Sequence, residues 1–559
     1  MGYGTGATDS IFANSCMKFD DIQHPVLSHL YIPMNFYSTQ AVTSDEEGNL
    51  QFYTNGIYVA GADHEQMQNG YGLNPGPDFG FFSDTGYRLD QGVISLPAPG
   101  QPDKYYIVHA EFERQGEPVF YSPNLRYTVV DMNLLNGAGA VTEKNVLLNE
   151  GYFDSGQLTA VKHANGSDWW VVQPDLETNE YYVYLLDQTG ISLHDVQTID
   201  SDFPDGLGQS VFTPDGTKYV RFQTNLVAGP LYFLVADFNR CTGVFSNYQS
   251  DNFFENSIGT LGTGGAVSSN SRYFYATTSY FLYKYDLWAE DIPGSRITIL
   301  ENDLIPAPVS TAPFYLCQLA PDGKIYIATH NGNNVYHVIH RPNRAGLACQ
   351  AEQRGLNLPS MNLATIPNNP NYRLGPIDGS PCDTLSIDNL PLCDFRYDPD
   401  TLDDKTIEFT EVTHYEPTDW YWTFGDGNTS TELNPVHEYE SSGTYEVCLT
   451  VSNEYGSDSK CRTLQIISTA TAEVYRQEEI TSLPNPARDF VYLQMQRGLP
   501  SGSVWQLHDA GGRLVSSQPL GAGRRQRIDL ADNLASGLYF QSISHGGRVL
   551  WRERVTVLP

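Results

Sequence analysis

The residues of this chain that could do chemistry rarely stand at the spacing that catalysis or metal binding requires. None of the eight cysteines is in Cys-x-x-Cys spacing and no histidine pair accompanies them, so structural zinc is not expected. Neither Gly-x-Ser-x-Gly nor His-Glu-x-x-His occurs. The carboxylates of the turn Asp200–Asp205 could hold Ca²⁺, although they lack the full spacing of a dedicated calcium loop. We assign no catalytic or cofactor-binding residue, leave metal ligands unknown, and keep calcium as the one candidate cofactor.

The segment Trp420–Gly427 combines aromatic residues, glycine and aspartate, which are also the residues of many binding sites. Its surroundings predict strands at Thr406–Phe409, Asp419–Phe424, Thr444–Val451 and Ser459–Ile466. This pattern suits a seven-stranded immunoglobulin-like sandwich. Trp422 would then fill the core between the sheets, and Gly425, Asp426 and Gly427 would form the tight turn after its strand.

Three motifs in this region resemble the polycystic-kidney-disease (PKD) repeat. They are Trp-x-Phe-Gly-Asp-Gly at 422–427, Pro-x-His-x-Tyr at 435–439 and Gly-x-Tyr-x-Val at 443–447, in that order. The resemblance implies an extracellular spacer or adhesion module. It also implies structural roles for Trp422 and Asp426.

Two cysteines of this region indicate an oxidising destination. Cys448 and Cys461 are equidistant from the turn Asn453–Gly456, so a regular hairpin places them directly opposite each other. We predict a disulfide between them, since only a small adjustment brings opposed positions into disulfide range. The alternative is two facing thiols. A pairing of Cys382 with Cys393 or Cys349 is a weaker prediction.

Upstream of this region, a two-residue turn followed by an aromatic-rich strand recurs every 50 to 63 residues. The turns are Glu47-Gly48, Pro102-Asp103, Asn165-Gly166, Asp215-Gly216, Asn270-Ser271 and Asp322-Gly323. These residue types tolerate positive φ and suit tight hairpins. A strand-rich repeat of this length is typical of the blades of a β-propeller.

The repeat predicts six or seven blades. A seventh would combine the first 35 residues with the stretch after Leu347, and the alternative fold is a double-sheet sandwich or an irregular β-domain. This segment also resembles the N-terminal propeller-like domain of large secreted proteins of gliding Bacteroidetes, through 45–56, 67–73 and 371–382. Because the Gly-rich start at Met1 looks internal to such a domain, we expect a truncated or miscalled start and a missing leader.

The C-terminal part has a different composition: from Thr471 onward there is no lysine, and ten arginines stand against eight acidic residues. Strands are predicted throughout, which indicates a small β-sandwich. The segments Leu483–Ala487, Val504–Val515 and Ile528–Phe540 resemble the type A C-terminal sorting domain of type IX secretion substrates. The resemblance implies an interaction with the type IX secretion machinery and export across the outer membrane.

Composition excludes some classes of function. The formal net charge is −34, with 66 acidic and 32 basic residues, which argues against nucleic acid as a partner. The sequence contains no run of 18 or more apolar residues, so no transmembrane helix is predicted. Residues 1–6 lack the features of a signal peptide.

We therefore predict an all-β chain: a propeller at 1–380, a linker at 381–394, a PKD domain at 395–467, a linker at 468–480 and a sorting domain at 481–559. The predicted function is that of a secreted or cell-surface binding or adhesion protein. In this hypothesis the propeller recognises an extracellular glycan or protein, and the PKD domain is a spacer. One alternative is an extracellular propeller enzyme, a glycan lyase or hydrolase. The other is a structural surface protein linked to motility or matrix.

Overall fold

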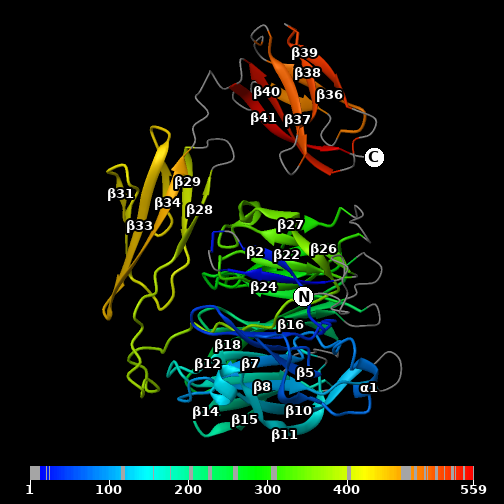
Figure 1. The fold of residues 1–559 in the computed structure, drawn as a ribbon, viewed down its shortest axis with the longest axis vertical. Coiled ribbons are helices and arrows are strands. Elements are labelled where there is room, and N and C mark those ends of the chain that lie inside the picture. The colour runs from blue at the N-terminus through cyan, green and yellow to red at the C-terminus, as the bar shows by residue number, and fades with distance from the viewer. Residues whose placement is uncertain are drawn as a thin grey trace.

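The computed structural model describes residues 13–557 except 20–21, 24, 115–119, 155, 177, 200–205, 225–228, 256–261, 304–310, 331, 400–404, 467–479, 484–486, 496–498, 500–501, 510–513, 522, 531–533, 535–536 and 546–547. Three β-rich bodies follow one another along the chain, coloured blue to green, yellow, and orange to red in Figure 1. Among the described residues, no helix is long and apolar enough to cross a membrane.

The first body contains six antiparallel units of four strands, which we call blades 1 to 6; the first two are joined in one nine-stranded sheet, and the other four are separate sheets. Blade 1 contains β3 (Ala41–Ser44), β4 (Leu50–Thr54), β5 (Tyr58–Gly61) and β6 (Gln66–Tyr71). Blade 2 contains β7 (Val93–Pro97), β8 (Lys104–Ala110), β10 (Phe120–Asp131) and β11 (Ala140–Phe153). Blade 3 contains β12 (Thr159–Lys162), β13 (Trp169–Pro174), β14 (Glu180–Asp187) and β15 (Gly190–Thr198). A bridge between Gln68 and Ala140 joins blades 1 and 2, and the short β9 (Glu113–Arg114) pairs with β10.

Blade 4 contains β16 (Leu207–Phe212), β17 (Lys218–Thr224), β18 (Leu231–Asn239) and β19 (Val244–Phe253). Blade 5 contains β20 (Gly264–Val267), β21 (Tyr273–Thr277), β22 (Phe281–Asp286) and β23 (Ile297–Glu301). Blade 6 contains β24 (Phe314–Leu319), β25 (Ile325–Thr329), β26 (Asn333–Ile339) and β27 (Ala351–Asn362). First strands of neighbouring blades contact one another: β3 with β7, β12 with β16, β16 with β20, and β20 with β24. This arrangement is that of a β-propeller, with the first strands innermost.

All six predicted turns are confirmed, and each joins the first strand of a blade to its second. Their second residues have φ between 59° and 85°, as Gly, Asp or Ser. Since strands alternate in direction within a blade, these turns all lie on one face of the ring. We call it the turn face, and we call the opposite face, where one blade connects to the next, the loop face.

The described residues form six blades, and those predicted to complete a seventh form other elements. The stretch after Leu347 supplies β27, the fourth strand of blade 6. β1 (Asn14–Lys18) and β2 (Val26–Leu30) form a hairpin against β27, where the hydroxyls of Ser15 and Ser360 lie 2.7 Å apart. The hairpin has two strands and its own sheet, so it covers blade 6 and adds no blade.

Aromatic side chains fill the space between blades, which explains the 36 tyrosines and 26 phenylalanines of the chain. Phe233 of β18 and Tyr285 of β22 stack with their ring centroids 4.1 Å apart and their planes 4° apart. Trp169 of β13 is fully buried in the core that joins blades 2 and 3. Blade-to-blade packing of this kind makes burial of aromatic area the main driving force for closing the ring.

The second body is a sandwich of two sheets with seven strands, as predicted. One sheet contains β28 (Phe395–Pro399), β29 (Thr406–Glu411) and β32 (Val436–Glu438), and the other β31 (Thr429–Ser430), β30 (Asp419–Thr423), β33 (Gly443–Asn453) and β34 (Gly456–Ile466). Trp422 of β30 is fully buried and packs against Phe395 and Phe409 of the facing sheet, with centroids 5.1 and 5.5 Å away. Its indole N–H donates to Glu432 O at 2.9 Å.

One predicted cysteine pairing is confirmed and the weaker one is wrong. Cys448 and Cys461 stand opposite each other in the β33–β34 register and form a disulfide. Cys382 pairs with Cys241, which follows β18, and both Cys349 and Cys393 are free and buried. The pairing of Cys382 is set by the closure of the ring, because the chain returns to blade 4 before it reaches Cys382.

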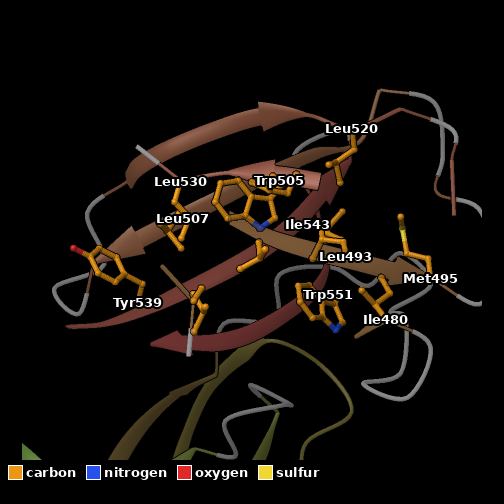
Figure 2. Close-up of a cluster of buried hydrophobic side chains, with 14 of the residues drawn as sticks. Ile480, Leu493, Met495, Trp505, Leu507, Leu520, Leu530, Tyr539, Ile543 and Trp551 are labelled. Atoms are coloured by element: carbon orange, nitrogen blue, oxygen red, sulfur yellow. The ribbon is translucent and has the colours of Figure 1, made fainter. Parts of the chain in front are cut away.

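The third body is a smaller sandwich. Its sheets contain β35 (Ile480–Leu483), β36 (Phe490–Met495) and β39 (Arg525–Asp529), and β38 (Leu514–Pro519), β37 (Val504–Asp509), β40 (Gly537–His545) and β41 (Arg548–Val557). Figure 2 shows its core, where Trp505 and Trp551 lie among aliphatic side chains. The Trp505 N–H donates to Gln541 Oε1 at 3.0 Å, so this indole is buried without an unpaired donor.

Trp422→Ala should destabilise the second body by about 3–5 kcal/mol, because it removes a fully buried indole from between its sheets. Urea unfolding of the full chain, followed by hydrogen exchange of β30 and β33, measures the effect. Tyr421→Ala in the same strand is the matched control, because Tyr421 is 49% exposed, and its expected cost is within about 0.5 kcal/mol. Equal effects of the two substitutions would contradict the assignment of Trp422 to the core.

Candidate functional site

The central channel of the propeller is where a site is expected, since the first strands of neighbouring blades meet around it. The chain that leaves β27 enters this channel. Thr365 and Asn368 bond to Ser38 O and Gln40 O, which precede β3 at the loop face. Farther along, Asn371 Nδ2 donates to Pro214 O and Ile377 N to Ala164 O, both 2.9 Å away and both just past a first strand at the turn face. Residues 363–377, the channel segment, therefore run from the loop face to the turn face.

Asn368 holds the middle of the channel segment. Its amide nitrogen Nδ2 donates to Val93 O at 3.1 Å and to Leu158 O at 2.9 Å, and its Oδ1 accepts from Gln91 Nε2 at 3.1 Å. One buried side chain thus joins the entrances of β7 and β12 to the segment. A buried amide with all these bonds made is favourable, whereas its removal leaves several backbone groups unpaired.

Two glutamines bond to the backbone of first strands two blades away, in the pattern that another strand would use. Gln91 accepts from Ser210 N and donates to Ser210 O, both at 2.9 Å. Gln209 accepts from Cys317 N at 2.7 Å and donates to Cys317 O at 3.2 Å. These side-chain amides satisfy backbone groups that face the channel and would otherwise be buried without partners.

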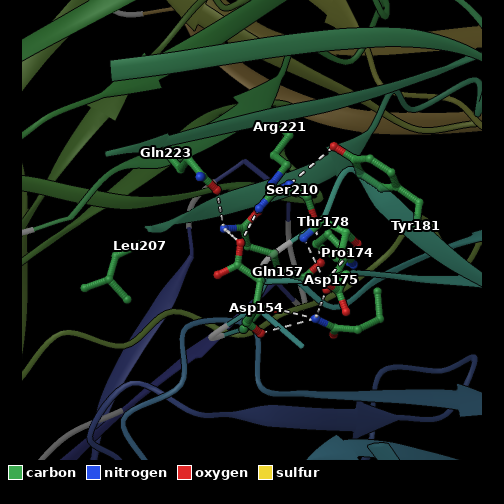
Figure 3. A network of polar contacts seen from close by, with 12 residues as sticks. Asp154, Gln157, Pro174, Asp175, Thr178, Tyr181, Leu207, Ser210, Arg221 and Gln223 are labelled. Carbon is green, nitrogen blue, oxygen red and sulfur yellow. Dashed lines mark hydrogen bonds and ion pairs between the residues drawn. The ribbon is translucent and has the colours of Figure 1, made fainter. Parts of the chain in front are cut away.

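A buried charged network lies beside the channel between blades 3 and 4 (Figure 3). Arg221 of β17 and Asp154, before β12, form an ion pair in which both side chains are at most 2% exposed. Gln157 accepts from the Arg221 Nε and donates to Gln223 Oε1 at 2.8 Å. Burial lowers the pKa of Arg221, but the nearby Tyr181 and Asp154 outweigh it and raise the pKa overall. Arg221 is thus a permanent buried cation with partners on two blades.

A second buried carboxyl, Asp90, lies just before β7. It accepts a hydrogen bond from the hydroxyl of Tyr315 in β24. Burial raises the pKa of Asp90 to about 6, although hydrogen bonds from Tyr315 and Ser38 oppose the shift. The ring of His330 stands edge-on to Tyr315 at 4.9 Å. Asp90 and Asp154 are buried against protein groups, so neither is placed to give a proton to a substrate.

Other histidines of the propeller serve as structural groups. His109 bonds to Asn74 Oδ1 at 2.6 Å and to Thr128 Oγ1 at 2.9 Å, and burial lowers its pKa to about 3. Burial also lowers the pKa of His337 to about 3, and its Nε2 donates to Ala312 O at 3.1 Å. Both imidazoles are therefore neutral at physiological pH.

The loop face carries exposed aromatic residues beside this closed channel. α1 (Phe79–Phe82) connects blades 1 and 2 and exposes Phe81, 64% of which is in contact with solvent. Tyr71 packs edge-on against Phe79 at 5.7 Å. On the same face, the guanidinium of Arg88 lies 4.0 Å over the ring of Tyr37. Rings and a guanidinium at this edge can stack on planar or ring-shaped groups of a ligand.

The residues singled out in the PKD domain make contacts within that domain. Gly425 has φ +80°, and an added Cβ would lie 2.7 Å from Glu446 O, so the turn requires glycine. Asp426 accepts from Asn428 N at 2.9 Å and bonds to His437 Nε2 at 2.7 Å. Although burial raises the pKa of Asp426, these hydrogen bonds hold it below its usual value. Gly427, with φ +96°, completes the turn.

The predicted calcium turn Asp200–Asp205 lies outside the described residues. Within the described ranges, no three His, Cys, Asp or Glu side chains are grouped so that they could hold a metal ion. The channel residues Gln91, Gln209 and Asn368 were not found from the sequence, because single glutamines and asparagines carry no local signal.

Comparison with protein families identifies two parts of the chain. Residues 391–467 match the PKD domain family, and residues 482–557 match the secretion system C-terminal sorting domain family. These matches indicate an extracellular, secreted protein that interacts with secretion machinery through its C-terminal domain.

Individual relatives cover little of the chain. Collagenase ColQ1 of Bacillus cereus is 54% identical over 44 residues, 8% of this chain and 5% of that protein. A microbial collagenase of Vibrio alginolyticus is 32% identical over 110 residues, 20% of this chain and 11% of that protein. The chain thus spans a small part of the length of these relatives.

Solved structures with local similarity include the PKD1 domain of Vibrio anguillarum Epp, 27% identical, covering 14% of this chain and 96% of that one, with a TM-score of 0.13. Another is hydrazine synthase of Kuenenia stuttgartiensis, 11% identical, covering 74% of this chain and 98% of that one, with a TM-score of 0.37. Both scores lie below 0.5, so the propeller assignment rests on the strand topology itself.

Arg221→Met should destabilise the propeller by about 3–5 kcal/mol, because it leaves the Asp154 carboxylate buried without its cation. Lys218→Met on the same strand is the control: Lys218 pairs with Asp237 at a partly exposed position, and the expected loss is at most about 1 kcal/mol. Urea unfolding monitored by tryptophan fluorescence gives both values. A loss at Arg221 no larger than that at Lys218 would show that the buried pair contributes little.

The raised pKa of Asp90 predicts a pH dependence of stability. The folded protein keeps the proton up to pH about 6, whereas an unfolded aspartate releases it near pH ~3.9. The contribution of Asp90 to the free energy of unfolding is therefore fully present below the unfolded pKa and is lost as the pH rises through the folded pKa. The total loss is about 3 kcal/mol.

Unfolding of wild type and Asp90→Asn at pH 4 and pH 7 tests this dependence. The stability of wild type relative to the variant should fall by most of that amount between the two pH values. Asp195→Asn, at an exposed position, is the control for replacing a surface carboxylate by an amide. A pH-independent difference between wild type and Asp90→Asn would refute the assigned titration.

Proposed function

We propose that this protein is a secreted or surface-displayed binding protein whose propeller recognises an extracellular glycan or protein at its loop face. The observation that carries the proposal is the channel segment. Because the chain fills its own channel from one face to the other, recognition takes place on the outer surface of the ring. The loop face offers Phe81, Tyr71 and the Arg88–Tyr37 stack there.

This proposal assigns a role to each part of the chain. Residues 1–380 are the recognition head, 381–394 a linker, 395–467 the PKD domain, 468–480 a second linker and 481–559 the sorting domain. The PKD domain acts as a module that holds the head away from the sorting domain. The second linker is the zone in which the sorting domain would be removed during export.

We further propose that the protein is a type IX secretion substrate of a member of the Bacteroidetes. The sorting match at 482–557 supports this origin, because such domains address proteins to that machinery. After export the head would be released or anchored at the outer surface. In both cases the loop face is exposed to the medium.

The alternative of a glycan lyase or hydrolase requires two carboxyl groups open to a substrate at about 5–10 Å from each other. Asp90 and Asp154, two carboxyls at the channel, are both buried and bonded to Tyr315 and Arg221, respectively. Binding without turnover is therefore the function that the described residues support best. A structural role in motility or matrix is favoured by no specific contact among those residues.

Glycan and protein arrays probed with the full chain test the proposal. The variant Phe81→Ser with Arg88→Ala should lower the affinity for any ligand found by about tenfold or more, since such anchors dominate binding. Trp288→Ser is the control, because Trp288 is 63% exposed but lies in a third-to-fourth-strand loop on the turn face. Unchanged affinity of the loop-face variant, or a loss of affinity with Trp288→Ser, would contradict a binding site on the loop face.

A further inference from the structure

The chain between the propeller and the PKD domain is tied down at its start by a covalent bond. The channel segment ends at Ile377, and five residues later Cys382 forms a disulfide with Cys241 beside β18 of blade 4. The two cysteines are 141 residues apart in sequence, so the bond closes a long loop. Cross-links across long loops remove the most freedom from the opened chain.

Arg240, which precedes Cys241 in sequence, binds the end of the channel segment and the turn of blade 3 through hydrogen bonds. Its guanidinium donates to Gly375 O at the end of the channel segment. It also donates to Lys162 O at 2.9 Å and to His163 O at 3.2 Å, both at the turn of blade 3. The disulfide and this guanidinium therefore hold the exit of the channel segment to blades 3 and 4, while β27 holds its entrance to blade 6.

The PKD domain is docked against blade 6 by its own set of contacts. Glu408 of β29 accepts from Arg344 Nη2 at 2.6 Å and pairs with Arg341. Arg396 of β28 donates to His340 O at 2.9 Å. These bonds join charged groups of β28 and β29 to the chain that connects β26 to β27.

The linker is fixed to the far end of the PKD domain as well. Asn453, at the tip of the β33–β34 hairpin, donates from Nδ2 to Asn389 O at 2.6 Å. Asn389 in turn donates to Pro376 O at 3.2 Å, next to the end of the channel segment. The PKD domain is thus bonded to the propeller at blade 6 and, through the linker, at the exit of the channel.

We propose that the Cys241–Cys382 disulfide is an oxidation-dependent lock: it retains the channel segment and holds the PKD domain in one orientation on the propeller. Without it, the exit of the segment depends on hydrogen bonds that water can replace. The channel segment then opens more readily at the turn face, and the PKD domain is held only by its contacts with blade 6 and by the hydrogen bonds of the linker. The lock would form when the chain reaches an oxidising compartment.

The chemistry of the lock is a thiol–disulfide exchange. To close it, the thiols of Cys241 and Cys382 give up two protons and two electrons to a small disulfide, which becomes two thiols, and the Sγ–Sγ bond forms. To open it, a dithiol such as dithiothreitol gives two electrons and two protons to the bond and closes to its own cyclic disulfide. Both cysteines are only partly buried, which leaves the bond open to such a reagent.

Hydrogen exchange of the full chain measures the lock directly. In the variant Cys241→Ser with Cys382→Ser, the amides of Asn368 and Ile377 should exchange at least about tenfold faster than in wild type, because the exit of the channel segment is no longer tethered to blade 4 and opens locally more often. Cys448→Ser with Cys461→Ser is the matched control, since it removes a disulfide within one hairpin. It should leave the exchange of residues 363–377 unchanged.

Two further measurements distinguish loss of the disulfide from misfolding of the variant. The amides of β17 and β25 report the fold of the blades and should exchange at wild-type rates in both variants. In wild type, dithiothreitol should produce the same faster exchange at 363–377 and a new protease-sensitive site in 383–392, and its replacement by glutathione disulfide should reverse both. Unchanged exchange of 363–377 in the Cys241/Cys382 variant and in reduced wild type would overturn the proposal.

Discussion

The structure of the propeller depends on how the backbone groups that face its axis find hydrogen-bond partners. In a ring of blades, each first strand has one edge toward the channel, and a buried unpaired N–H or C=O destabilises a fold by about 1–3 kcal/mol. Here Gln91 and Gln209 pair with Ser210 and Cys317, and Asn368 bonds to two further strands. The chain thereby replaces the water that would fill an open channel.

This constraint explains where the protein can interact with other molecules. A filled channel leaves the blades rigid and their loops free to vary, which is the usual arrangement for a recognition surface on a scaffold. The linker that leaves the channel is bonded to the propeller at Cys241 and to the PKD hairpin at Asn453. The PKD domain is consequently docked on the head in this structure, and the spacing it provides is that of a fixed module.

Much of the fold could be predicted from the sequence, because it is encoded locally. Turn residues such as Gly166 and Asp103 adopt positive φ, so the repeated turns mark all six blades. Trp422 and the Cys448–Cys461 pair follow from strand alternation within one sandwich. The channel segment, the glutamine pairs and the Cys241–Cys382 bond depend instead on ring closure, which brings together residues with no shared local pattern. For the same reason the candidate site on the loop face was not predicted.

The filled channel is tested most directly by the reactivity of a thiol placed in the channel segment itself. Thr365 is fully buried and its hydroxyl donates to Ser38 O, and the small substitution Thr365→Cys puts a thiol at this position. The native variant would be treated with a small methanethiosulfonate reagent, and labelling would be followed by mass spectrometry with the less buried Cys16 as the internal reference. If the channel is filled, the introduced thiol is labelled only after the protein unfolds, whereas Cys16 is labelled in the native state. Rapid labelling of the introduced thiol in the folded protein would show an open channel and contradict the arrangement described above.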